Sequence, residues 1–117
     1  MYDIELYQTA SGNVPLRRYF REIKKRFGPG EFNSIRLYVD LLAAHGMKIN
    51  NYHPHSIRQI DGDLYELRPG NNRIFFFYFR DDTFVLLHAF RTQQQQTPKH
   101  EIDTARKRME DHKRRNS

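Results

Sequence analysis

The segment of residues 64–109 constrains the fold more than any other part of the chain. It contains two strand-like apolar runs with basic residues at their ends, followed by a basic helix that Thr97-Pro98 introduces. Residues 74–79 read IFFFYF, so this run is apolar on both faces and predicts a central strand that is covered on each side. Strands this close in sequence pair antiparallel, because a parallel pair needs a long crossover connection.

The other strands are expected where apolar residues alternate over short stretches. Such stretches lie at residues 2–8 and at about 56–60, 64–69, 73–80 and 83–91. Side-chain alternation places Leu64, Glu66 and Arg68 on one face of their strand. It also places Phe84, Leu86, His88 and Phe90 together on one face of theirs. Whether these two faces coincide depends on the register, which the pattern leaves open.

Three helices are expected from helical spacing and from glycine and proline. Asn13 is the expected N-cap of a first helix with Pro15 in its first turn. Gly28-Pro29-Gly30 separates it from a second helix that ends near Gly46, which predicts a helical hairpin. Thr97 is expected to cap the last helix, with Pro98 at its first position and a frayed tail at 113–115. The predicted fold is α+β, with a small, mostly antiparallel sheet, the N-terminal hairpin and the C-terminal helix.

Composition limits the classes of protein to consider. The 117 residues show no linker or repeat and predict one domain, residues 1–117. There is no cysteine, which excludes disulfides, thiolate metal sites and a cysteine nucleophile. The chain starts with no signal peptide and has no apolar run long enough for a membrane, so we expect a cytoplasmic protein. The net charge of +6 favours an anionic partner such as nucleic acid, although a basic protein without such a partner is the alternative.

Two sets of residues carry candidate chemistry. Residues 17–26 hold six Lys or Arg against one acid, and this face can follow phosphates or can be an ordinary solvated helix face. The candidates there are Arg17, Arg18, Arg21, Lys24 and Lys25. A second set is expected at one end of the sheet and comprises Glu66, Arg68, Arg73, His88 and Arg91. Cross-strand ion pairs between Glu66 and the arginines are the alternative interpretation. His45, His53 and His55 are expected to be loop histidines rather than metal ligands.

Five ordered blocks resemble the RelE/HigB superfamily of toxin-antitoxin ribonucleases, in particular its phage-derived HigB-like branch. These blocks are LYELR at 64–68, RIFFFYF at 73–79, LLHAFR at 86–91, Thr97-Pro98, and the helix segment at 101–108. The resemblance implies a RelE/ParE-like fold and a small toxin that cuts mRNA on the translating ribosome. It also implies a cognate helix-turn-helix antitoxin, no cofactor, and functional roles for Arg68, Arg73 and the residues from His88 to Arg91.

RNA cleavage without a metal needs a base, cations and an acid. The base takes the proton of the ribose 2′-hydroxyl, the cations stabilise the phosphorane, and the acid protonates the leaving 5′-oxygen. Glu66 or His88 can serve as base or acid. The arginines and Lys99 can clamp phosphate.

The linker departs from the pattern of the family. Thr92, Gln93 and Gln96 are neutral where the family commonly has lysines, which weakens phosphate binding. The sequence is compatible with an attenuated toxin, a detoxified variant or a member that relies on Arg91 and Lys99 instead. Gln93 and Lys99 are the RNA contacts expected in this segment. Two alternatives to an mRNA interferase therefore stay open. One is a ParE-like toxin that cleaves no RNA and inhibits another target such as DNA gyrase. The other is a non-catalytic module that binds RNA or the ribosome.

Overall fold

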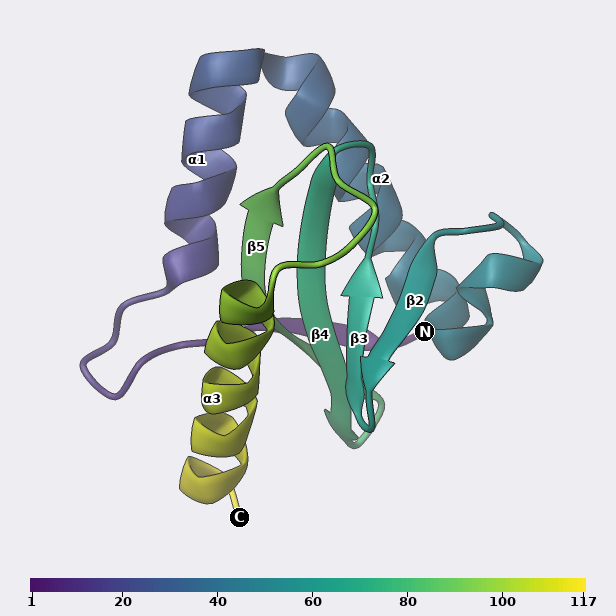
Figure 1. The fold of residues 1–117 in the computed structure, drawn as a ribbon. Coiled ribbons are helices and arrows are strands. Elements are labelled where there is room, and N and C mark those ends of the chain that lie inside the picture. Colours follow the sequence, from purple (N-terminus) through teal and green to yellow (C-terminus); the bar gives the residue numbers. More distant parts are fainter.

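The computed structural model describes residues 1–117 and has an α+β architecture (Figure 1). The strands are β1 (Asp3–Leu6), β2 (Ile57–Asp61), β3 (Leu64–Leu67), β4 (Asn72–Arg80) and β5 (Thr83–Arg91). The helices are α1 (Pro15–Phe27), α2 (Pro29–His45) and α3 (Lys99–Arg115), and a 3-10 helix η1 (Gly46–Asn51) follows α2. The predicted α+β class is confirmed. Helix α3 covers one face of the sheet, and the hairpin of α1 and α2 packs on the other (Figure 1).

The sheet has five strands in the order β1-β5-β4-β3-β2, so β4 is central as its apolar sequence predicted. Strands β2 to β5 pair antiparallel in succession. Strand β1 pairs in parallel with β5, which makes the sheet mixed. This parallel pair is possible because the helical hairpin and three strands separate β1 from β5 in the chain.

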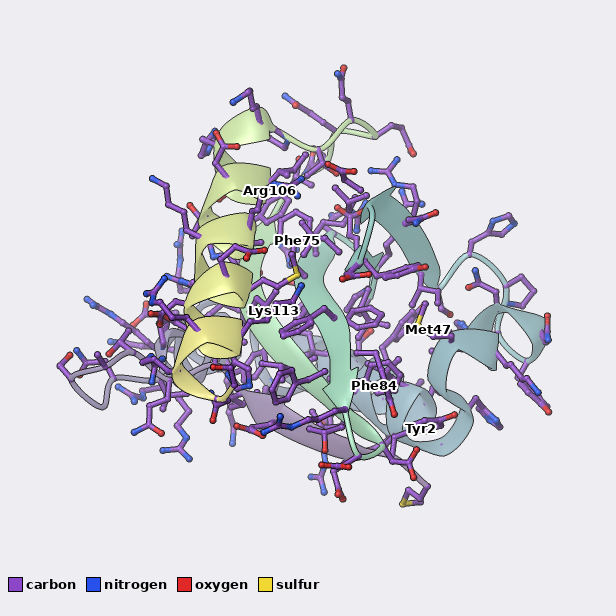
Figure 2. All side chains as sticks on the ribbon, turned by 90° about the horizontal axis from the view of Figure 1, so that it is seen from below. Tyr2, Met47, Phe75, Phe84, Arg106 and Lys113 are labelled. Atoms are coloured by element: carbon purple, nitrogen blue, oxygen red, sulfur yellow. The ribbon has the colours of Figure 1, made fainter.

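The core consists of two apolar layers that share β4. Ile74 and Phe76 point toward the hairpin, whereas Phe75 and Phe77 point toward α3. In Figure 2, Phe75 lies between the sheet and α3, and Phe84 lies on the opposite side with Tyr2. All of these phenylalanines are almost completely buried. Burying one such side chain stabilises the fold by roughly 2–3 kcal/mol, so the aromatic run contributes mainly to the core.

The ends of the helices differ from the sequence prediction. The N-cap of α1 is Val14, without a side-chain hydrogen bond. Asn13 is wrong as the predicted cap, because it lies one residue before the N-cap and its side-chain amide instead donates to Ser11 Oγ. Pro98 rather than Thr97 is the N-cap of α3, and the Thr97 hydroxyl bonds to the sheet. The predicted fraying at 113–115 is also wrong, since α3 continues to Arg115. Lys113 pairs there with Asp63 across the molecule.

A β-bulge in β5 overturns the predicted alternation of its side chains. Phe75 pairs with His88 and Phe76 pairs with Leu86, so β5 has one extra residue at this point. Leu86 therefore packs in the layer of the hairpin, while His88 stacks on Phe75 and Phe90 on the side of α3. The predicted common face for Phe84, Leu86, His88 and Phe90 is wrong. The bulge places His88 on the same face as Glu66, because Glu66, Phe75 and His88 are aligned across three strands.

Candidate functional site

A group of three arginines surrounds one buried carboxylate at the end of β3. Glu66 is fully buried. Its Oε1 atom lies 3.4 Å from Arg58 Nη2, 3.6 Å from Arg68 Nε and 3.9 Å from Arg73 Nε. We call these four residues the arginine cluster. Three guanidinium groups against one carboxylate leave an excess of positive charge, so the cluster remains attractive to an anion after its internal pairing.

The arginines of the cluster differ in how far they reach the surface. The side chains of Arg58, Arg68 and Arg73 are 41%, 19% and 8% exposed. Arg73 is also tied down by its Nη1, which donates to the carbonyls of Gly70 at 2.7 Å and Asn72 at 2.9 Å. Burial is the main cause that lowers the pKa of Arg73. Arg58 and Arg68 are therefore the members that can contact a ligand. Arg73 is buried beneath them and contributes positive charge from a fixed position.

The linker between β5 and α3 closes over the cluster. The hydroxyl of Thr97 donates to Glu66 Oε2 at 2.7 Å and accepts from Arg58 Nη2 at 2.8 Å. Gln95 Oε1 accepts a long hydrogen bond of 3.4 Å from Arg68. Glu66 Oε1 and Arg68 Nε make no hydrogen bond. The linker thus fixes Glu66 and Arg58 through Thr97, and it holds Arg68 only weakly.

His88 forms a second polar group on the same face of the sheet. Its Nε2 lies 2.8 Å from Glu101 Oε1 in the first turn of α3, and its Nδ1 lies 3.3 Å from Arg108 Nη1. Burial is the main cause that lowers the pKa of His88, and it outweighs the opposite effect of Glu101. His88 is therefore neutral near pH 7, and a neutral imidazole can accept a proton. Its backbone lies about 10 Å from that of Glu66, two strand spacings away.

Beside His88 the structure has a small cavity of about 140 Å³. Pro15, Leu16 and Tyr19 of α1 line one side of it, and His88 and Arg108 line the other. His88 and the cavity lie along the part of β5 that follows the residues paired with β1.

Arg91 does not join the other candidate residues. It pairs in register with Asn72, one residue before Arg73, so it lies on the hairpin face of the sheet. Its Nη1 donates to Glu31 of α2, and its guanidinium lies 4.0 Å from the centre of the Phe27 ring. The structure thus brings Glu66, Arg68, Arg73 and His88 to one face and places Arg91 at the same end of the sheet on the other.

The expected RNA-binding residues fall into two groups. Arg17, Arg18, Arg21, Lys24 and Lys25 are exposed on α1 and form no ion pair. The first three line an open depression of about 890 Å³ beside the loop that precedes α1. Lys99, by contrast, pairs with Asp103 one turn further along α3. Gln93 is exposed in the linker.

Several residues that organise this end of the sheet are not indicated by the sequence pattern. One is Arg58, whose pairing with Glu66 follows only once β2 and β3 are in register. Glu31, Glu101 and Arg108 come from helices whose orientation the sequence pattern does not fix. Their signal is limited to position: Glu31 and Glu101 lie in the first turns of their helices, where acids are favoured.

No group of three or more His, Cys, Asp or Glu side chains lies close enough to hold a metal ion. His53 Nδ1 instead lies 2.7 Å from Ser56 Oγ, and the ring of His45 stacks on Tyr52. None of the helices combines the length and the apolar character that a membrane crossing requires.

The fold and the cluster define a small α+β domain with a basic sheet end. The sequence profile of one family, described as phage-derived protein Gp49-like (DUF891), matches residues 25–110. This match covers more than half of the chain and includes the whole arginine cluster, so the chain belongs to the Gp49-like family. That family is related to the RelE/HigB toxins, which agrees with the resemblance at the level of the superfamily. A search of curated proteins found no match.

Proposed function

We propose that this protein is the toxin of a toxin-antitoxin system and a metal-independent endoribonuclease. It cleaves mRNA on the translating ribosome in the cytoplasm, and a cognate helix-turn-helix antitoxin neutralises it. Membership of the Gp49-like family and the RelE/HigB resemblance support the toxin class. The observation that carries the nuclease proposal is the arginine cluster, which concentrates positive charge on the same face of the sheet as a neutral histidine two strands away.

In the proposed reaction, the residues of that face have different roles. Arg58 and Arg68 bind the scissile phosphate and stabilise the charge that develops on the phosphorane. Arg73 adds positive charge from a fixed position. Glu66 is buried and surrounded by guanidinium groups, so its role is to position them rather than to touch RNA.

His88 is the proposed general base. A substrate 2′-hydroxyl replaces the long contact between His88 Nδ1 and Arg108, and Nδ1 takes its proton. The 2′-oxygen then bonds to phosphorus, and the bond from phosphorus to the 5′-oxygen breaks. Water at the open edge supplies the proton that the leaving 5′-oxygen needs. The products are a 2′,3′-cyclic phosphate and a 5′-hydroxyl end.

A second RNA-binding region of the proposal is the basic face of α1. Its arginines and lysines form no ion pair, so they are available to phosphates of the mRNA or the ribosome. Lys99 and Gln93 complete the expected contacts at the start of α3 and in the linker. The contact of Lys99 with Asp103 is exposed, and RNA can replace it at little cost.

Primer extension on an mRNA in a purified translation reaction, with ribosomes present or omitted, tests the nuclease proposal. We expect new 5′ ends only when ribosomes are present. Arg68→Ala should abolish them, whereas Arg36→Ala should leave them unchanged, because Arg36 is exposed on α2 and forms no ion pair. Intact mRNA under both conditions overturns the nuclease proposal. If a Thr92→Lys/Gln93→Lys variant then cleaves the mRNA, the neutral linker is the cause of the missing activity.

The neutral linker favours one second candidate, a ParE-like toxin that inhibits DNA gyrase without cutting RNA. Thr92, Gln93 and Gln96 are neutral at positions where the resemblance implies lysines, and Gln95 reaches only one arginine of the cluster. Inhibited supercoiling together with intact mRNA would support this candidate. Salt-dependent RNA binding without cleavage or gyrase inhibition would instead support a non-catalytic RNA- or ribosome-binding module.

A further inference from the structure

Arg91 is held in one orientation by groups from both helices of the hairpin. Phe27 at the end of α1 supports the plane of its guanidinium at 4.0 Å, and Glu31 in the first turn of α2 accepts a hydrogen bond from its Nη1. The end of β5 and the tip of the hairpin lie at the same end of the molecule (Figure 1). These contacts fix a long side chain that would otherwise sample many rotamers.

The orientation of Glu31 is itself fixed by a directional chain of hydrogen bonds. The Tyr19 hydroxyl donates to Asn72 Oδ1 at 2.7 Å, and Asn72 Nδ2 donates to Glu31 Oε1 at 2.9 Å. Burial is the main cause that raises the pKa of Tyr19, so this hydroxyl stays protonated and remains a donor. The hydrogen bond from Arg91 is the main cause that lowers the pKa of Glu31, which therefore stays ionised and accepts from both partners.

The fixed guanidinium keeps most of its binding capacity. A guanidinium has five N–H donors, and the contact with Glu31 engages one of them. The Arg91 side chain is 29% exposed, so the remaining donors can reach a ligand from solvent. Planar pairs of N–H donors bind phosphate oxygens in a bidentate manner. An arginine that is already oriented loses less conformational entropy when it does so.

The position of Arg91 makes it distinct from the arginine cluster. Asn72 and Arg91 face the hairpin, whereas the next residue, Arg73, faces α3 and Glu66. The two sites are therefore on opposite faces of the sheet at the same end, and a strand that reaches both must cross that end. Phe27, which contacts Arg91, is the last residue of α1, and the exposed cations Lys24, Lys25 and Arg26 precede it in the last turn of that helix.

We infer that Arg91 is a phosphate-binding position for single-stranded RNA on the hairpin face, and that Glu31 is its positioning residue. The RNA backbone passes from the arginine cluster over the end of the sheet to Arg91 and on to α1. This inference rests on the proposed function only in taking RNA as the ligand. Arg91 thus acts in binding rather than in the chemical step. Glu31, although it is an acid on a surface that binds a polyanion, favours binding because it orients Arg91.

The sign of the effect of Glu31 separates positioning from simple electrostatics. Removing an acid from a polyanion-binding surface tightens binding when the acid acts only through its charge. If Glu31 positions Arg91, its removal instead weakens binding, because the guanidinium then has to be ordered by the RNA. Glu22 provides the matched control, since it is an exposed acid on α1 that forms no ion pair.

The test is the affinity for a short single-stranded RNA of mixed sequence, fully 2′-O-methylated so that it cannot be cleaved, measured by fluorescence anisotropy. We expect Arg91→Gln to weaken binding about tenfold and Glu31→Ala to weaken it about threefold. Glu31→Gln retains an acceptor and should fall between Glu31→Ala and the unmodified protein. Glu22→Ala should bind as tightly as the unmodified protein or more tightly.

A double-mutant cycle shows whether Glu31 acts through Arg91. In the Arg91→Gln background, Glu31→Ala should produce no further weakening. The thermal unfolding midpoint of each variant shows whether it still folds. Phe27→Leu removes the aromatic contact of Arg91 but keeps the charges of Arg91 and Glu31, and it should also weaken binding. Tighter binding by Glu31→Ala overturns the inference, as does the absence of binding by the unmodified protein. RNA binding with this pattern but without mRNA cleavage would refute the nuclease proposal and leave the inference standing.

Discussion

At the scale of single residues, Glu66 determines the stability of the proposed catalytic face. Its carboxylate is buried among three guanidinium groups, and Arg73 is itself almost fully buried. Removing one partner of a buried ion pair leaves the other charge without compensation. Arg58 and Arg68 can turn toward solvent, but Arg73 is held by two backbone carbonyls and cannot.

Glu66→Gln should therefore lower the free energy of unfolding by roughly 2–4 kcal/mol. Urea denaturation followed by circular dichroism measures this change. Glu22→Gln is the control, because the same substitution at an exposed acid without an ion pair should stay within about 0.5 kcal/mol of the unmodified protein. Equal stability of the two variants would show that Glu66 does not compensate the buried arginine.

Burial also gives two histidines a measurable effect on stability. It is the main cause that lowers the pKa of both His88 and His112. The unfolded chain then binds protons that the folded protein does not. The stabilisation is present above the ordinary histidine pKa of about 6.5 and is lost as the pH falls through the lower folded-state value.

His112→Phe should flatten the loss of stability on the acid side. The ring of His112 packs edge-on against Phe77 and Phe79, and its buried Nε2 makes no hydrogen bond, so phenylalanine suits the site. We expect a smaller loss of unfolding free energy between about pH 7.5 and about pH 5 in this variant than in the unmodified protein. Urea titrations at both pH values measure it. His55→Asn, at an exposed histidine that forms no hydrogen bond or ion pair, is the matched control.

At the scale of secondary-structure elements, the junction between α2 and η1 depends on a glycine. Gly46 has a φ of 59°, and a Cβ atom there would lie 2.5 Å from the Tyr2 ring, which packs on Phe84. Gly46→Ala should therefore lower the free energy of unfolding by about 1–3 kcal/mol. Gly30→Ala is the matched control, since no atom lies within 4 Å of its Cβ position in α2. Thermal unfolding of both variants measures this difference. Equal stability of Gly46→Ala and Gly30→Ala would contradict the predicted strain at Gly46.

The existence of the helices and strands could be predicted from sequence, because local signals specify them. Gly28 between α1 and α2 has a φ of 90°, which glycine adopts readily, and the doubly apolar run became the central strand. The bulge in β5 could not be predicted, since no glycine or proline marks it and only the pairing with β4 reveals it. The same bulge places His88 on the face of the sheet that also carries Glu66.

The candidate site could be predicted only in part, for the same reason. Arg68 and Arg73 flank one turn and were expected together, and the structure brings both to Glu66. The sequence also predicts Arg91 in this group, because it ends a neighbouring strand. Its register partner Asn72 places it on the opposite face, and its contact with Glu31 depends on how the hairpin packs. Such contacts arise from tertiary packing, which periodicity does not encode.

At the scale of the whole molecule, the positive charge is distributed unevenly between two basic helices. Most cations of α3 are paired, with Arg106 on Asp61, Lys113 on Asp63, and Arg114 and Arg115 on Asp111. The cations of α1 form no ion pair, although the two helices look similarly basic in sequence. Of these two helices, α1 therefore carries most of the unpaired charge, and it belongs to the hairpin that also holds Arg91.

This uneven distribution predicts how RNA binding depends on salt. Each phosphate contact with a single strand contributes about 0.7 to the slope of log affinity against log salt concentration. The triple variant Arg18→Gln/Arg21→Gln/Lys25→Gln should lower that slope by about 2. The triple variant Arg36→Gln/Lys48→Gln/Lys107→Gln removes the same charge from exposed, unpaired positions elsewhere and should change the slope much less. Fluorescence anisotropy with the 2′-O-methylated RNA over a salt series measures both. Equal changes in the two variants would mean that net charge alone attracts the RNA and that α1 is an ordinary solvated face.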